Sequence, residues 1–402
     1  MVLQMDMVQS MALGVVVLLI GSYLVRKIDF LERFCIPAPV VGGTLFAILA
    51  LIMHLTGIID FQMDDTLRVV AMTAFFTTVG FSASFRLLKK GGIKVFIFLG
   101  LAVGLVTLQN ILGLGLATLF DLNPLIGLAT GSVPMTGGHG TAASWGPELE
   151  KAGAIGAEAI AVAAATFGLI AGSMMGGPLG KRLIEKNKLL EKKGSLAKNG
   201  DRINISNLSE EESKLVPNNF AVGAYQILIA MGVGTIISSF IVEKTGWTFP
   251  PYIGAMLAAA IIRNLSDITN IYEVPTIEID VIGSIALSLF LSMALMALKL
   301  WELADLAIPF IVMLVAQVLL MASFAYFVTF NVMGRDYDAA VLAGGHCGFG
   351  LGATPNGIAN MTAITGRFGA SPVAFFILPL VGSLFIDFFN VAVITFFMNL
   401  FV

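Results

Sequence analysis

The chain alternates long apolar runs with short polar breaks. Ten of these runs are long enough to cross the roughly 30 Å hydrocarbon core of a bilayer as helices. They lie at 8–27, 38–57, 66–87, 93–119 and 155–180, and then at 219–242, 249–265, 279–299, 306–333 and 372–401. This pattern predicts an all-α polytopic membrane protein whose spans fall into two sets of five.

Two further segments, 124–146 and 338–362, are apolar but interrupted by many glycines. Glycine weakens a helix interior, so neither segment is expected to cross the membrane as one continuous helix. We predict that each enters as a broken helix and returns to its own side, which is a re-entrant loop. Non-helical backbone at membrane depth is tolerated only where protein or a water-filled cavity covers it.

A charged stretch separates the two sets of spans. It contains KRLIEKNKLLEKKG from residue 181 and SEEESK before residue 215, which are too polar to enter the bilayer or to form a core. We therefore divide the chain into an N-terminal half at 1–180, a linker at 181–218 and a C-terminal half at 219–402.

The distribution of basic residues predicts the orientation. With this topology, 19 of the 23 Lys and Arg residues fall on one side, and only Arg68, Lys151, Lys244 and Lys299 fall on the other. Loops rich in Lys and Arg remain in the cytoplasm. The linker is therefore expected to be cytoplasmic, with both termini outside.

The composition agrees with a lipid solvent and excludes several classes of function. Hydrophobic residues make up 57% of the chain and charged residues 12%, and the mean hydropathy is +0.92. The net charge of -3 and the lack of a basic face argue against a nucleic-acid partner. Cys35, Cys347 and three histidines offer neither a disulfide framework nor a metal-ligand spacing, and no hydrolase motif is present, so we expect no enzyme and no organic cofactor.

The second half of the chain matches the first at an offset of about 214 positions. The offset pairs FFTT at 75–78 with LFLS at 289–292, and it pairs the two glycine-rich segments with each other. Because each half has an odd number of spans, the second half must be inserted upside down. Inverted repeats are typical of secondary transporters, whose sites lie at mid-membrane where broken helices meet.

Several polar residues at membrane depth are candidates for binding. Free amides at a helix N-terminus attract carboxylates, and free carbonyls coordinate sodium. Asp387 and Asn390 share a helix face in the last span and fit sodium or a substrate ammonium, or else a hydrogen-bonded packing pair. His139 and His346 fit substrate contact and a structural role at a helix end equally well.

Four strings resemble the bacterial sodium/glutamate symporter family, and the similarity runs over nearly the whole chain. They are TGGHGT at 136–141, YDAAVLA at 337–343, GHCGFGLGATP at 345–355 and ALMALKLWEL at 294–303. The family usually carries Ser where this chain has Thr136, which keeps the hydroxyl and adds a methyl. The chain also resembles, more distantly, the sodium/citrate carriers, in which a transport domain moves against a dimerising scaffold.

The resemblance implies uptake of L-glutamate with Na⁺ as the coupling ion, by a homodimer in the lipid of the bacterial inner membrane, with alternating access of the elevator type. The expected substrate residues at the two loop tips and in the last span are Thr136, Gly137, Gly138, His139, Thr141, Gly350, Gly352, Thr354, Asn356 and Asp387. The expected sodium ligands are Thr354, Asn360, Asp387 and Asn390.

Two rival functions remain open from the residues alone. The first is a sodium- or proton-coupled carrier of another dicarboxylate or amino acid. The second is an ion channel in which the same loops form a filter. Channels usually build filters from several copies around one axis, whereas this chain carries two inverted loops, which favours a transporter.

Overall fold

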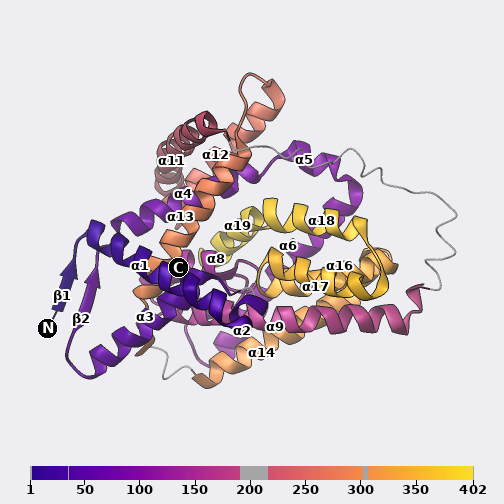
Figure 1. Ribbon diagram of the computed structural model, residues 1–402, viewed down its shortest axis with the longest axis horizontal. Helices are drawn as coiled ribbons and strands as arrows, with labels where there is room; N and C mark the ends of the chain where they lie inside the picture. The colour runs from indigo at the N-terminus through magenta and orange to yellow at the C-terminus, as the bar shows by residue number, and fades with distance from the viewer. Residues whose placement is uncertain (1, 35, 191–215, 302–306, 402) are drawn as a thin grey trace.

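The computed structural model describes residues 2–34, 36–190, 216–301 and 307–401, and it is predominantly helical (Figure 1). Seven single helices and one bent pair among these residues are long and apolar enough to cross a membrane, which confirms the polytopic prediction. The long helices of the first half are α1 (Met7–Lys27), α3 (Ala38–Leu55), α4 (Thr66–Ser82), α6 (Gly92–Leu119) and α9 (Ala157–Lys186).

The helices of the second half begin with α11 (Pro217–Thr245), α12 (Pro251–Thr269) and α13 (Thr276–Met296). Next, α14 (Ala307–Ser323) continues through a π-helical stretch, η3 (Phe324–Thr329), into α15 (Phe330–Val332). The span expected at 372–401 is instead two helices, α18 (Pro372–Leu384) and α19 (Ile386–Met398), bent by 46°. The break falls at Phe385, whose backbone leaves the helical region.

The two glycine-rich segments are interrupted helices, as the sequence predicts. In the first segment α7 (Pro124–Ala129) and α8 (Gly138–Lys151) are separated by a series of turns. In the second segment α16 (Tyr337–Leu351) and α17 (Thr354–Phe368) are separated by two residues. We refer to the residues at these two interruptions, 130–141 and 350–356, as tip 1 and tip 2.

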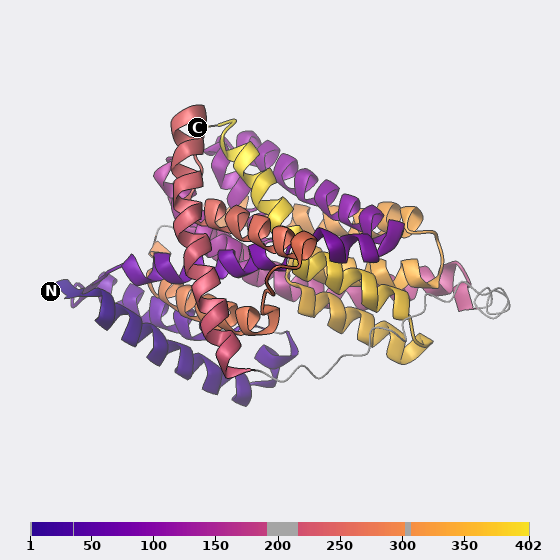
Figure 2. The ribbon, with the colours of Figure 1, turned by 90° about the horizontal axis from the view of Figure 1, so that it is seen from above.

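The helices pack into two bundles that each draw on both halves of the chain. In the first bundle, α4 packs on α12 and α13, α1 packs on α3, and α11 packs on α12. In the second bundle, α9 packs on α8, α16 and α17, while α6 contacts α7, α14, α18 and α19. Figures 1 and 2 show the indigo α1 and α3 toward one end of the long axis and the yellow α16 to α18 toward the other.

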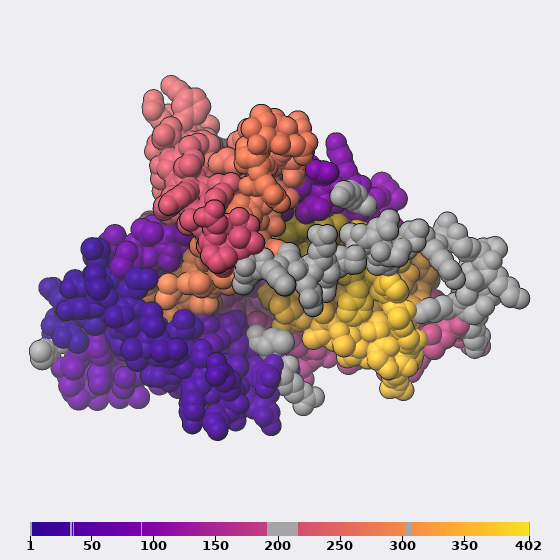
Figure 3. Space-filling view, turned by 45° about the horizontal axis from the view of Figure 1, so that its top comes forward, coloured from indigo at the N-terminus to yellow at the C-terminus, as the bar shows by residue number. Residues whose placement is uncertain are grey.

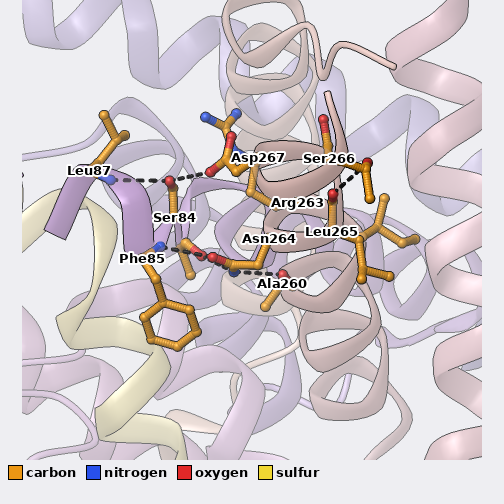
Figure 4. A network of polar contacts seen from close by, with 12 residues as sticks. Ser84, Phe85, Leu87, Ala260, Arg263, Asn264, Leu265, Ser266 and Asp267 are labelled. Carbon is orange, nitrogen blue, oxygen red and sulfur yellow. Dashed lines mark hydrogen bonds and ion pairs between the residues drawn. The ribbon is translucent and has the colours of Figure 1, made fainter. Parts of the chain in front are cut away.

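A short helix, α5 (Phe85–Lys90), connects α4 of the first bundle to α6 of the second. Figure 4 shows how α12 holds the start of this connector. The Asn264 amide accepts from the backbone N–H of Phe85 at 2.9 Å and donates to the carbonyl of Ala83 at 2.8 Å. The Ser84 hydroxyl donates to Asp267. The connector therefore leaves the first bundle from a fixed point.

Three features near the N-terminus and the linker differ from the prediction. A parallel ribbon of β1 (Val2–Met5) and β2 (Asp60–Met63) ties the N-terminus to the loop between α3 and α4, and the sequence did not predict it. A one-turn helix, α2 (Asp29–Arg33), follows α1. The first residues of the expected linker extend α9 as far as Lys186, and residues 191–215 lie outside the described part of the chain.

Candidate functional site

A cavity of about 600 Å³ lies where the two tips, the break between α18 and α19, and the first bundle meet. A volume of this size suits a small organic ligand. The first bundle contributes Phe75 and Phe76 of α4 and one face of α13, and the second contributes most of the polar groups. The residues expected from the sequence that line the cavity are Thr136, Gly137, Gly138, His139, Thr141, Gly352, Thr354, Asn356 and Asp387.

Tip 1 presents the first turn of α8 to the cavity. Gly137 precedes this helix, and Gly138 begins it with a φ of +63°, a backbone conformation that L side chains rarely adopt. The first amides of a helix have no partner inside the helix. The Gly138 N–H donates to the Pro134 carbonyl at 3.0 Å, so the amides that follow it in the first turn are those available to a ligand. A methyl group on Gly138 would lie 2.9 Å from the carbonyl oxygen of Gly352, so the two tips touch at this point.

Tip 2 presents the start of α17 to the same cavity. Ala353 has an extended backbone between the two helices, and its carbonyl accepts from the N–H groups of Asn356 and Gly357. The Asn356 amide nitrogen donates to the Leu169 carbonyl at 3.0 Å and to the Ser173 hydroxyl at 2.7 Å, both on α9. Its buried amide oxygen has no hydrogen-bond partner among the described residues. This oxygen is therefore a free acceptor in the cavity wall.

Gln109 of α6 joins the two tips from behind the cavity. Its amide nitrogen donates to the Gly350 carbonyl at 2.7 Å, and its amide oxygen accepts from the Thr136 hydroxyl at 2.8 Å. Gln109 is fully buried, and Gln317 of α14 donates to its backbone carbonyl. The sequence places Gln109 only at the middle of a span. The structure shows that it holds tip 1 and tip 2 in register.

Asp387 provides a carboxylate in the cavity wall. It lies in the first turn of α19, directly after the break, where the helix dipole favours a negative charge. It forms no hydrogen bond or ion pair with another described residue. A desolvated carboxylate without a partner is costly in a membrane protein, so a cationic ligand group is the natural complement.

The two histidines weighed in the sequence have different surroundings. His139 lines the cavity, and its Nε2 lies 2.9 Å from the Thr166 hydroxyl of α9. His346 lies outside the cavity, is fully buried, and pairs its Nδ1 with the Thr329 hydroxyl at 2.9 Å. Phe349 stacks on its ring at 5.5 Å. His346 therefore has the structural surroundings of a packed helix residue.

Three of the expected site residues lie outside the cavity wall. Gly350 faces Leu105 and Met321 and offers its carbonyl to Gln109. Asn360 donates to the Gly172 carbonyl of α9 at 2.9 Å. Asn390 donates to the Ser132 carbonyl of tip 1 at 3.2 Å, and its buried amide oxygen has no described partner.

Other cavity residues were not expected from the sequence. Ser284 and Ser288 lie one helical turn apart on α13 and face the cavity, as does Ser383 at the end of α18. The signal that could have found them is a hydroxyl pair spaced by four residues inside an apolar span. Both α13 hydroxyls also donate to carbonyls of their own helix, which is the common behaviour of serine in such helices.

The donor set limits the cations that this site can hold. No group of three His, Cys, Asp or Glu side chains within the described ranges could hold a metal ion. A cation bound here would be held by carbonyl, amide and hydroxyl oxygens with a single carboxylate. Hard monovalent ions such as sodium accept oxygen ligands of this kind.

The comparisons with known proteins agree on one family. A family model described as "Sodium/glutamate symporter" matches residues 3–370. A sodium/glutamate symporter of Escherichia coli (strain K12) is 40% identical over 402 residues, which cover 98% of both chains. A sodium/glutamate symporter of Haemophilus influenzae is 41% identical over 392 residues, covering 96% of this chain and 95% of the relative. These relatives are named as transporters and not as enzymes, in agreement with the prediction from the sequence.

Proposed function

Because this chain belongs to the sodium/glutamate symporter family, we propose that it takes up L-glutamate across a membrane with the inward sodium gradient as the driving force. One observation carries the proposal beyond the family name. The cavity combines the N-termini of two helices, α8 and α17, with one carboxylate, Asp387, that has no partner among the described residues. Glutamate, with two carboxylates and one ammonium, has the complementary set of charges.

The substrate lies between the two tips in this proposal. The amides of α8 that follow Gly138 hold one carboxylate. The N–H and hydroxyl of Thr354 at the start of α17 hold the other, since Pro355 has no N–H and the Asn356 N–H donates to the Ala353 carbonyl. Asp387 pairs with the ammonium group. Support comes from the touching tips, which bring both helix N-termini to one cavity.

Sodium binds beside the substrate in this proposal, held by oxygen atoms of the second bundle. Of the expected ligands, Asn390 is supported by its unpartnered amide oxygen next to Ser132, whose hydroxyl is also buried without a described partner. Thr354 and Asp387 are supported by their place at the cavity. Asn360 has its amide nitrogen engaged with α9, so it contributes only its oxygen.

The proposal includes the inverted repeat and the two re-entrant loops. Support comes from contacts between residues that the offset makes equivalent. The Thr136 hydroxyl lies 3.3 Å from the Gly350 carbonyl, 214 positions later. Phe75 of α4 stacks at 6.2 Å on Phe290 of α13, which the offset pairs with the neighbouring Phe76. His54 on α3 is 213 positions before Asp267 on α12, and both hold connectors between the bundles.

Alternating access follows if the second bundle moves against the first in an elevator-like step. The cavity supports this because one wall belongs to each bundle. Fixed connectors support it as well: Asp267 holds the start of α5, and the His54 ring stacks at 4.1 Å on Trp301, which follows α13. A moving bundle needs attachment points of this kind on a stationary one.

The remaining features of the proposal concern the membrane and the assembly. The chain resides in the bacterial inner membrane, with both termini outside and the linker in the cytoplasm, as the basic residues indicate. It forms a homodimer. Support comes from α11, which Figure 3 shows raised above the rest of the molecule and which exposes Leu228, Ile236 and Phe240.

Gradient-driven uptake tests the function directly. Purified protein in liposomes is expected to accumulate labelled glutamate only when sodium is higher outside than inside. Equal uptake with choline in place of sodium would refute the coupling, and a proton gradient that drives uptake without sodium would favour the rival carrier. Competition by other dicarboxylates and amino acids then defines the substrate range.

A pair of substitutions at Asp387 and Asp280 tests the site. Asp387→Asn removes the charge but keeps the shape, so glutamate affinity should fall at least tenfold if the carboxylate pairs with an ammonium. A dicarboxylate without the ammonium should lose less. Asp280→Asn on α13 is the matched control, because this carboxyl lies outside the cavity. Wild-type kinetics of Asp387→Asn would remove Asp387 from the site.

A further inference from the structure

A second cavity, of about 560 Å³, lies between the C-terminal part of α9 and the π-helical stretch that follows α14. Figure 1 shows α9 and α14 running beside each other, and the two helices are in contact. It is separate from the substrate cavity and shares no lining residue with it. We call this cavity the α9 groove. Its walls are Met174, Met175, Pro178, Leu179, Arg182 and Lys186 on one side, and Ala322, Ser323, Tyr326 and Phe327 on the other.

The α9 wall changes from apolar to basic along a single helix face. Met174, Pro178, Arg182 and Lys186 follow one another at intervals of four residues, so they form one stripe. All four are exposed. Pro178 has no N–H, which leaves the Met174 carbonyl without its usual helical donor. The stripe therefore has an apolar part and a cationic end.

The length of α9 puts this cationic end at the level of lipid head groups. A helix of 30 residues is about 45 Å long, whereas the hydrocarbon core is about 30 Å thick. After Glu158 in the first turn, the next charged residue of α9 is Lys181, so the final part of the helix extends beyond the apolar region. Long basic side chains at such a depth lie beside lipid phosphates.

The two cations at this end, Arg182 and Lys186, can still form ion pairs with a ligand. Neither Arg182 nor Lys186 forms an ion pair with another described residue, since the nearby Glu185 pairs with Lys181 at 3.9 Å and Arg367 at 4.0 Å. Lys186 donates to the Tyr326 hydroxyl at 3.0 Å, and Arg182 acts on the same hydroxyl electrostatically. Three donors thus converge at the polar end of the groove.

We propose that the α9 groove binds one anionic phospholipid, with its phosphate between Arg182, Lys186 and Tyr326 and an acyl chain along Met174, Pro178 and Phe327. The charge complementarity selects an anionic head group, and the apolar wall selects a lipid over a free phosphate. The occupant bridges α9 of the first half and η3 of the second. Thr329 in η3 bonds to His346 in α16, so the η3 side of the groove is joined to one of the two helices that flank tip 2.

Local fluorescence quenching tests this assignment in the intact protein. A Phe327→Trp variant is placed in bilayers with brominated phosphatidylglycerol or brominated phosphatidylcholine of the same chains. The signal of the three native tryptophans is subtracted with the unsubstituted protein. Each basic residue near an anionic lipid changes affinity about fivefold, so phosphatidylglycerol should be preferred by roughly fivefold to 25-fold. Met174→Trp provides a second reporter in the same groove.

Matched variants separate this site from general attraction of anionic lipid. Arg182→Gln with Lys186→Gln should reduce the preference below about twofold, and Lys89→Gln with Lys94→Gln should leave it unchanged. Ile111→Trp, at an exposed position of α6, should report no preference. Glycerol phosphate in solution should not compete, because it has no chains. An equal preference in both double variants, no preference at either groove reporter, or competition by glycerol phosphate would overturn the assignment.

Discussion

Replacing Gln109 by leucine tests whether the two tips must be held together to bind substrate. The side chain is fully buried and makes two short hydrogen bonds, one to the Gly350 carbonyl and one from the Thr136 hydroxyl. Leucine is similar in size and has no polar atoms. The substitution therefore removes both hydrogen bonds of the Gln109 side chain, which we call the clamp, while it preserves most of the packing.

The expected magnitude follows from the groups left behind. A buried polar group without a partner costs about 1–3 kcal/mol. The Thr136 hydroxyl lies 3.3 Å from the Gly350 carbonyl, so these two groups can partly satisfy each other and the two costs do not add in full. We expect a net loss of about 1–3 kcal/mol, which corresponds to a roughly fivefold to 150-fold weaker glutamate affinity. This conversion holds if the clamp exists only in the binding-competent arrangement.

The assay is equilibrium binding and sodium-driven uptake of labelled glutamate by the purified protein in liposomes. Thr136→Val should give a similar defect, and Thr136→Ser should bind almost as tightly as the parent protein. The double variant of Gln109→Leu with Thr136→Val should show a coupling energy of about 0.5–3 kcal/mol. Gln226→Leu is the matched control, because Gln226 lies on α11 and donates to the Glu273 carbonyl.

Two outcomes would refute this reasoning. Unchanged glutamate and sodium affinities in Gln109→Leu, together with a lower melting temperature, would mean that the clamp is present in every state and stabilises only the fold. Strictly additive effects of Gln109→Leu and Thr136→Val would mean that the two side chains act separately.

Two further substitutions address the tips and the connector. Gly138→Ala should abolish uptake, because the added methyl group would lie 2.9 Å from the Gly352 carbonyl oxygen and the backbone φ is +63°. Gly57→Ala is the control, since Gly57 has a φ of +69° but open space around it, and this variant should only lower the melting temperature slightly. A Gly138→Ala variant that still transports glutamate would show that the tips separate freely. Asp267→Ala removes the acceptor of the buried Ser84 hydroxyl, far from the cavity, so it should lower the melting temperature by several degrees and leave glutamate affinity unchanged. Asp267→Asn should recover part of the lost stability. A large change in glutamate affinity would contradict a role of Asp267 in holding the connector alone.

The positions of most helices follow from the sequence because the solvent imposes them. Backbone groups in hydrocarbon must bond within their own helix, so most of the apolar runs are helices with nearly the expected bounds. The run at 38–57 corresponds to Ala38–Leu55, and the run at 93–119 corresponds to Gly92–Leu119. The glycine-rich stretches at the same depth predicted the two helix interruptions, between α7 and α8 and between α16 and α17, since glycine lowers the stability of a helix interior.

The bend in the last span was not predictable in this way. Residues 372–401 are apolar almost throughout, so their pattern is that of one span. The break at Phe385 brings Asp387 to the first turn of α19 and into the cavity wall. Local hydropathy does not contain this information, because the break is stabilised by what surrounds it.

The candidate site was predictable in its centre and not in its surroundings. The sequence indicated the membrane protein, the two interrupted helices and Asp387 as a carboxylate at membrane depth, because those depend on the chemistry of short segments in lipid. That Asp387 binds a ligand stays a prediction. Only the tertiary structure decided that Gln109 clamps the tips, that Asn360 and Asn390 face neighbouring backbone, and that Ser284 faces the cavity. Each of these choices depends on the distance between atoms that lie tens or hundreds of residues apart in the chain, and a helical pattern specifies the buried face without specifying its partner.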